Sequence, residues 1–262
     1  MEGSAWPATF RLEEAAKDFA TLARQAGRPE VAAVGDWTVA DTIAHVALLL
    51  SMYERIVAGQ GSPATSFDSD EFNREALAQF AERNMAVLAG SIEESAQRIA
   101  RALASQPAGA RLAWHAGVNI RAEHVAGLLI GELRVHGLDI ARAERVRWAI
   151  TNDDAVLIFQ SLAMLAPTLI ADTRGIRGTV NVKLRRAETF RFIAEASGLR
   201  VERAGSVRHG RADLHVSAQP TALVLLAYNR TRTWNAVLSG RVRAWGWRPW
   251  LGVSFSRLIP KP

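Results

Sequence analysis

The sequence contains no cysteine, only three lysines and no long uninterrupted apolar run. The lack of cysteine excludes disulfide scaffolds, cysteine-ligated zinc and a cysteine nucleophile, so any thiol chemistry would need an external thiol. The first ten residues lack the basic and apolar segments of a signal peptide. No stretch approaches the roughly 18 consecutive apolar residues of a membrane span. We therefore expect a cytoplasmic protein with no membrane-spanning segment.

Length and charge divide the chain into two parts. Its 262 residues, 49% of them hydrophobic and 22% charged, suit two modest globular domains. Residues 1–150 carry 15 basic and 19 acidic residues, whereas residues 151–262 carry 17 basic and 7 acidic residues. Nearly all the basic residues are arginine, which favours planar anionic partners such as carboxylates. These features predict a small anionic substrate held where the two bodies meet.

The first half has the apolar spacing of helices. Thr38 and Asp41 resemble a capping box that starts the second of them, and Asn119 is placed to cap the fourth. The expected helices cover Phe10–Ala26, Val39–Val57, Glu71–Ser105 (one helix, or two joined near Gly90 and Ser91) and Asn119 to about Ala143. Four helices with short or moderate connections predict a four-helix bundle over residues 1–149.

The period changes after Trp148. Two more helices are expected, at Asn152–Ile170 and Pro220–Tyr228. Alternating runs predict strands at Thr179–Leu184, Thr189–Ala194, Leu199–Arg203, Ala212–Ser217 and Arg241–Trp245. The fold class is therefore α+β, with a mainly antiparallel sheet in a second domain over residues 150–262.

Three side chains with metal-binding chemistry occupy positions where a helix would otherwise present apolar residues. Glu132 and His136 are four residues apart and share one helix face, and His45 stands between apolar neighbours. Burying a carboxylate is costly unless it is paired or binds a metal. Two imidazoles and one carboxylate match a catalytic zinc site with an open fourth position. The alternative is that Glu132 pairs with Arg134 or Arg142 at the surface and the histidines are hydrogen-bonded core residues.

Two segments carry a family resemblance. They are Asp36-Trp-Thr-Val-Ala-Asp-Thr-Ile-Ala-His45 and Glu132-Leu-Arg-Val-His136-Gly-Leu-Asp-Ile-Ala-Arg-Ala143. Together they resemble the two signatures of the mycothiol-dependent maleylpyruvate isomerase family. The resemblance implies a DinB-like metal-binding four-helix bundle followed by a sterol-carrier-protein-like domain. It also implies that His45, Glu132 and His136 are the ligands of a divalent metal, zinc by preference.

The same resemblance implies a reaction. Mycothiol would be the thiol cosubstrate, and a metal would favour its thiolate form by lowering the thiol pKa. The thiolate would add to the cis double bond of maleylpyruvate, and rotation followed by elimination would give the trans product. Two other functions stay open on the sequence. One is a mycothiol S-transferase of the same fold, and the other is a noncatalytic carrier of a metal or an apolar ligand.

Arg230 is the candidate to hold the anionic substrate and to stabilise an enolate. Arg232 and Arg241 are the next candidates for this role. The alternative for Arg230 is a solvated cation at a helix C-terminus. The tryptophan-rich tail interleaves Arg248 with aromatic rings, an arrangement that can stack bases. A tail that closes over its own domain or the interdomain cleft is the simpler interpretation, so we expect no nucleic-acid partner.

Other polar residues near the signatures are weaker candidates for the functional site. His115 could line the mouth of the site, and His124 precedes Glu132 by about two helical turns. Asp139 and Arg142 are three residues apart, which favours a structural clamp between helices or domains. A role for Asp139 in orienting His136 is the less favoured alternative.

Overall fold

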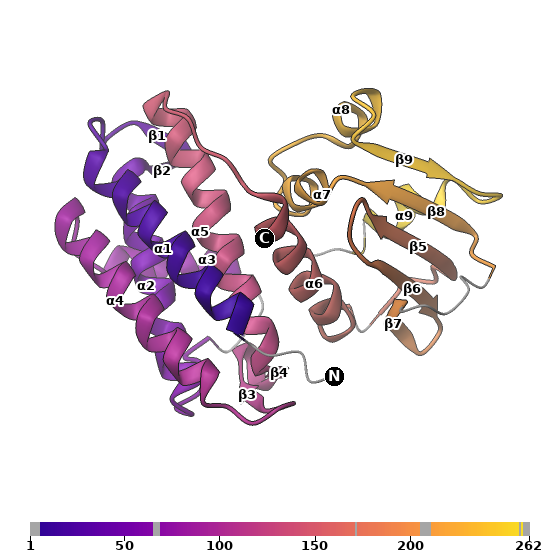
Figure 1. Ribbon diagram of the computed structural model, residues 1–262, viewed down its shortest axis with the longest axis horizontal. Helices are drawn as coiled ribbons and strands as arrows, with labels where there is room; N and C mark the ends of the chain where they lie inside the picture. The colour runs from indigo at the N-terminus through magenta and orange to yellow at the C-terminus, as the bar shows by residue number, and fades with distance from the viewer. Residues whose placement is uncertain (1–5, 65–68, 171, 205–210, 257, 259–262) are drawn as a thin grey trace. The chain divides into compact units, whose positions relative to one another are not determined.

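The computed structural model describes residues 6–64, 69–170, 172–204, 211–256 and 258. The chain divides into two compact units, Met1–Ile150 and Thr151–Pro262. The first unit is mainly helical and the second is built on a sheet (Figure 1). The α+β class predicted from the sequence is confirmed. Among the described helices, none combines the length and the apolar character needed to cross a membrane.

Four long helices form the bundle of the first unit. Helices α1 and α2 each pack against both α4 and α5. The four helices are α1 (Trp6–Gln25), α2 (Val39–Val57), α4 (Met85–Ala104) and α5 (Ala122–Glu144). Fully buried side chains such as Phe19, Leu50 and Leu129 fill the space between them. A shorter helix, α3 (Ser69–Gln79), contacts α2.

Two small hairpins in this unit were not predicted. The first pairs β1 (Ala32–Val34) with β2 (Trp37–Thr38), and the second pairs β3 (Arg111–Ala113) with β4 (Asn119–Arg121). Asn119 was expected to cap a helix, but it pairs with Ala113 and α5 begins three residues later. Strands of two or three residues are too short to show an alternating pattern, which explains the error.

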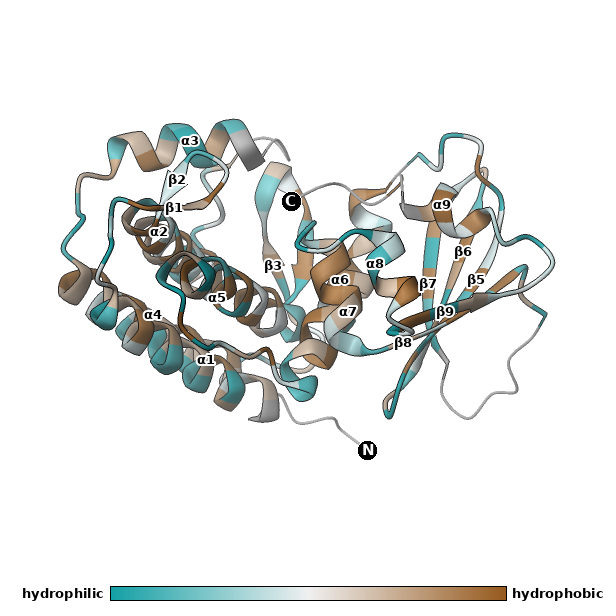
Figure 2. Ribbon diagram, turned by 90° about the horizontal axis from the view of Figure 1, so that it is seen from above, coloured by the Kyte–Doolittle hydropathy of each residue, from teal (hydrophilic) through white to brown (hydrophobic). Residues whose placement is uncertain are grey.

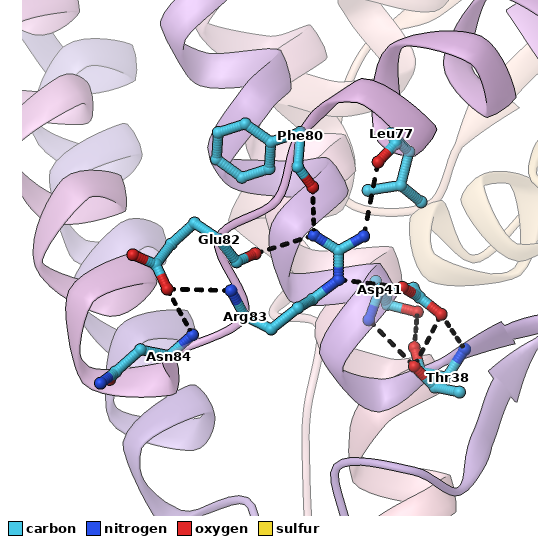
Figure 3. A network of polar contacts seen from close by, with 8 residues as sticks. Thr38, Asp41, Leu77, Phe80, Glu82, Arg83 and Asn84 are labelled. Carbon is cyan, nitrogen blue, oxygen red and sulfur yellow. Dashed lines mark hydrogen bonds and ion pairs between the residues drawn. The ribbon is translucent and has the colours of Figure 1, made fainter.

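The predicted helix over residues 71–105 is two helices, and the break is not at Gly90. It lies at Phe80–Asn84, where Asn84 caps α4 by accepting hydrogen bonds from the amides of Ala86 and Val87. The Arg83 guanidinium fills the break (Figure 3): it donates to the carbonyls of Leu77, Phe80 and Glu82. The expected cap at Ser91 is therefore wrong, because Arg83 and Asn84 satisfy the backbone groups of an earlier break.

Arg83 also joins this break to the start of α2. Its Nε donates to Asp41 Oδ1 over 3.1 Å, and Asp41 completes the predicted capping box with Thr38. The capping box fixes where α2 begins, which is just under two turns before His45. The Asp41 carboxylate of the first signature thus has a structural function, since it anchors the helix that presents His45.

Replacing Arg83 by alanine is expected to destabilise the bundle by about 1–3 kcal/mol, because several backbone carbonyls and the Asp41 carboxylate lose a donor. Urea unfolding of the full chain, followed by helical circular dichroism, measures the change. Arg98→Ala is the matched control, because Arg98 pairs with Glu54 at a more exposed position. The control should cost under about 1 kcal/mol. Equal losses in the two variants would contradict this role of Arg83.

The second unit is built on a five-stranded sheet of order β7-β6-β5-β8-β9. Its strands are β5 (Gly178–Leu184), β6 (Thr189–Glu195), β7 (Gly198–Ala204), β8 (Leu214–Ala218) and β9 (Val242–Trp245). Only the β5–β8 pairing is parallel among those between described strands. The prediction of a mainly antiparallel sheet is confirmed.

Helices cover the apolar face of this sheet. Ala163 of α6 packs with Leu184 and Phe190, and Leu251 of α9 packs with Val180. Figure 2 shows α6 and α7 beside the strands. The helices are α6 (Asn152–Leu169), α7 (Pro220–Ala227), α8 (Thr233–Leu238) and α9 (Leu251–Ser256). Helices α8 and α9 were not predicted, because six residues are too few for a helical period to emerge.

Candidate metal centre

The structure brings together the three side chains singled out in the sequence. His45 comes from α2, and Glu132 and His136 come from successive turns of α5. One ligand atom from each lies within 4.8 Å of those of the other two. His136 Nε2 is 3.3 Å from Glu132 Oε2, and the two imidazole centroids are 5.2 Å apart at an interplanar angle of 78°. Two imidazoles and one carboxylate therefore converge on one point.

The two histidines of this cluster are buried, and Glu132 is partly exposed. His45 is 4% exposed and His136 is 7% exposed, whereas the Glu132 side chain is 23% exposed. Neighbours on both helices, such as Ile43 and Leu133, are fully buried and apolar. Solvent therefore reaches the cluster at Glu132, which gives a ligand a side from which to approach.

The electrostatics of the cluster favour a cation. Burial and the neighbouring His136 lower the pKa of His45 to about 3, so that its imidazole is neutral at neutral pH with a lone pair to donate. Burial alone would lower the pKa of His136, but the carboxylates of Asp139 and Glu132 outweigh it and raise the pKa to about 9. The carboxylates that stabilise a protonated imidazole would equally stabilise a metal ion that displaces the proton.

Asp139 lies beside His136. Its carboxylate is buried, and Oδ2 is 3.5 Å from Nδ1 of His136. At this separation the contact is an ion pair without hydrogen-bond geometry, and Nδ1 remains a buried atom without a hydrogen bond. The sequence analysis favoured a clamp with Arg142. The structure instead supports the less favoured alternative, in which Asp139 faces the free ring nitrogen of a candidate ligand.

The other signature residues support the same two helices. The ring of Trp37, the first residue of β2, lies 4.7 Å from the His45 ring between centroids. Arg134, offered above as a surface partner of Glu132, is itself buried and forms a 2.7 Å ion pair with Asp18 of α1. The first signature therefore packs against His45, and the second anchors α5 to α1.

A group of aromatic side chains lies near the end of α2. Trp114 Nε1 donates to the Tyr53 hydroxyl over 2.9 Å, and both residues are buried. The His115 ring stands edge-on to Tyr53 at 6.1 Å between centroids, and its Nδ1 is 2.5 Å from Ser62 Oγ. His115 was singled out from the sequence, whereas Tyr53 was not. His124 lies outside the candidate metal cluster, with Nε2 3.6 Å from Glu123 Oε1.

Stability of the metal-free protein is expected to rise from pH 4 to pH 6.5. Burial lowers the pKa of His115 from 6.5 to about 4. Between these pH values the unfolded chain binds more protons than the folded chain, so the free energy of unfolding rises with pH. One such group contributes at most about 1.4 kcal/mol per pH unit. His45 acts in the same direction. Denaturant midpoints at both ends of the window should differ less in His115→Asn than in the wild type; an identical difference would contradict this assignment.

Arg230 lies in the turn after α7. Its amide donates to the Leu225 carbonyl over 2.7 Å, and its Nη1 donates to the Tyr228 carbonyl over 2.6 Å. The helix was expected to run through Tyr228, but it ends at Ala227, and Asn229 follows with a positive φ of 55°. The side chain is half-buried and its guanidinium is hydrogen-bonded to the turn, while Arg232 and Arg241 are exposed.

Comparisons with known proteins agree with this architecture. Residues 11–141 match the family model described as the mycothiol maleylpyruvate isomerase N-terminal domain. The crystal structure of the mycothiol-dependent maleylpyruvate isomerase is similar, with a TM-score of 0.56 and 16% identity over 92% of each chain. A histidine-to-alanine mutant of that isomerase gives a TM-score of 0.55, with the same identity and coverage. No curated protein sequence matches the chain significantly. At this identity the two structures establish the fold.

Proposed function

The chain belongs to the mycothiol maleylpyruvate isomerase N-terminal domain family, and from this premise we propose that it is a metal- and mycothiol-dependent cis–trans isomerase. Its substrate would be a small anionic unsaturated acid of the maleylpyruvate type. One observation carries the proposal: His45, Glu132 and His136 converge inside the segment that matches the family.

The residues fit a divalent metal. Two imidazoles, which bind a metal in their neutral form, and one carboxylate would hold it. They would leave one coordination position open, as in catalytic zinc sites. The same donors also suit nickel, copper or iron, so the position is better defined than the element. His136 Nδ1 faces the buried Asp139 carboxylate, which would fix the ring and increase its basicity. When bound, such a cation supplies Lewis acidity that lowers the pKa of a coordinated thiol.

The chain's own residues would bind and orient the reactants. The partly exposed side of Glu132 admits the ligands, while the apolar walls of α2 and α5 keep water from the opposite side. The mycothiol thiolate would add to the cis double bond and generate an enolate. Rotation about the new single bond and expulsion of the thiolate would then give the trans isomer and regenerate the thiol. Arg230 is proposed to bind the carboxylate or the enolate oxygen.

Turnover with a limiting amount of mycothiol tests this function. Zinc-loaded protein is incubated with maleylpyruvate and a small fraction of one equivalent of mycothiol, and products are separated chromatographically. An isomerase regenerates the thiol, so many molecules of trans product should form per mycothiol. Stoichiometric consumption of mycothiol would instead indicate an S-transferase. No conversion by fully loaded protein would leave a carrier function and overturn the proposal.

A further inference from the structure

The tail that was expected to close over its own domain leaves its tryptophans in solvent. Leu251 packs against the sheet, but Trp247 is 69% exposed, and Trp245 and Trp250 are exposed as well. Among the described residues, seven of the ten exposed large hydrophobic side chains lie between Trp234 and Val253. Exposed apolar groups gathered in one region are typical of an interaction surface.

Helix α8 presents its apolar residues to solvent instead of to the core. Its one buried residue is Ala236, which packs with Val242 of β9. Trp234, Val237 and Leu238 have the i, i+3, i+4 spacing of a single helix face, and all three are exposed, Leu238 by 78%. A surface helix normally turns such a face toward the core. The outward face of α8 therefore has the composition of a binding surface.

The exposed groups lie at the two ends of one edge strand. Strand β9 is outermost in the order of the sheet, and α8 contacts it (Figure 1). Three residues join α8 to the start of β9, and Trp247 comes two residues after its end. We call this region the β9 edge surface. It comprises Trp234, Val237, Leu238, Trp245, Trp247 and Trp250.

The charge around the β9 edge surface has one sign. Residues 214–262 contain seven basic residues and no acidic residue. Arg232, Arg241 and Arg243 are exposed, and none of them forms an ion pair with another residue in the part of the chain that the structure describes. Unpaired positive charge beside exposed apolar groups favours a partner that is both anionic and apolar.

We propose that the β9 edge surface binds peripherally to an anionic lipid membrane. Indole rings favour the boundary between lipid and water, and Val237 and Leu238 bury apolar area there. The arginines attract the anionic headgroups. Binding of this kind needs no membrane-spanning helix, and it is independent of the isomerase activity proposed above.

Two other partners fit the β9 edge surface less well. A nucleic acid could stack its bases on the tryptophans, but it would leave Val237 and Leu238 without an apolar partner. A second copy of the chain in a symmetric dimer would bring the same patch to both sides of the interface. Arginines would then face arginines, because residues 214–262 supply no carboxylate side chain to pair with them.

Cosedimentation with vesicles tests this inference on the full-length protein. The vesicles contain phosphatidylcholine alone or phosphatidylcholine with phosphatidylglycerol, and the bound fraction is measured at low and at high salt. We expect binding to the anionic vesicles only, and weaker binding at high salt. Arg243→Ala should weaken binding about fivefold, because one basic residue near an anionic membrane contributes about 1 kcal/mol.

The α8 double variant Trp234→Ser/Leu238→Ser tests the apolar contribution. It should weaken binding to the anionic vesicles by about tenfold or more, because two side chains that bury apolar area in the membrane are lost. Phe10→Ser/Val87→Ser is the matched control. It removes two exposed apolar side chains of the first unit and should bind like the wild type.

Binding of the α8 double variant at the wild-type level, or equal binding of the wild type to both kinds of vesicle, would overturn the proposal. A dimer in gel filtration that this variant dissociates would assign the surface to a second copy. Binding of a single-stranded oligonucleotide without binding of vesicles would assign it to a nucleic acid. Should melting temperatures show that the α8 double variant does not fold, Trp247→Ser/Trp250→Ser gives the same test at the other end of β9.

Discussion

His136→Ala is expected to lose stoichiometric metal. The wild type should retain about one zinc per chain after dialysis, because two imidazoles and a carboxylate bind it together. Removal of one ligand leaves His45 and Glu132 on separate helices, and Asp139 loses the ring that it faces. Metal analysis of the dialysed proteins by mass spectrometry should show a nearly empty variant.

A matched change on the same helix controls for general damage to α5. His124→Ala removes an imidazole outside the cluster and should keep its zinc. Added zinc should also raise the melting temperature of the wild type and of this control but not that of His136→Ala, because a ligand stabilises only the protein that binds it. Stoichiometric metal in His136→Ala after dialysis would contradict the assignment of the ligands.

Arg230→Ala is expected to slow thiol-dependent turnover by about 10²–10³-fold. A charge-assisted contact to a developing enolate is worth about 2.7–4 kcal/mol in the transition state. The lost hydrogen bond to the Tyr228 carbonyl should cost only about 0.5–1.5 kcal/mol of stability, and zinc content should not change. Arg230→Lys should restore part of the activity, because an ammonium cannot reproduce the planar guanidinium fork.

Arg232→Ala and Arg241→Ala are the comparisons for this experiment. Both side chains are exposed in the same unit, so they test whether any nearby positive charge is enough. Unchanged turnover in Arg230→Ala would remove this residue from the mechanism. A large loss in one of the other two variants would transfer the role to that arginine.

The pairing of Glu132 with His136 in the candidate metal cluster could be predicted from sequence because it is local. Glu132 and His136 are one turn apart, so helical geometry alone places them on one face. His45 joined them through the signature that begins at Asp36. Tyr53 could not be identified in this way, because its partner Trp114 lies 61 residues away along the chain. Periodicity shows which face a residue occupies but not which side chain it meets across the core.

The fold shows the same limit. Long amphipathic helices such as α2 and alternating strands such as β6 were predicted closely, because burial of one face repeats along them. The break before α4 was misplaced, since it depends on backbone contacts of Arg83 rather than on a period. Asp139 was misjudged because an i, i+3 spacing fits both an arginine and a histidine neighbour.

The most direct test of the account is turnover of maleylpyruvate under four conditions: zinc-loaded or zinc-free protein, each with and without mycothiol. The cluster of His45, Glu132 and His136 is proposed to act only with a metal, and the chain itself has no cysteine to replace the thiol. The account predicts formation of the trans product only when zinc and mycothiol are both present. Equal turnover by zinc-free protein, or by zinc-loaded protein without mycothiol, would contradict it.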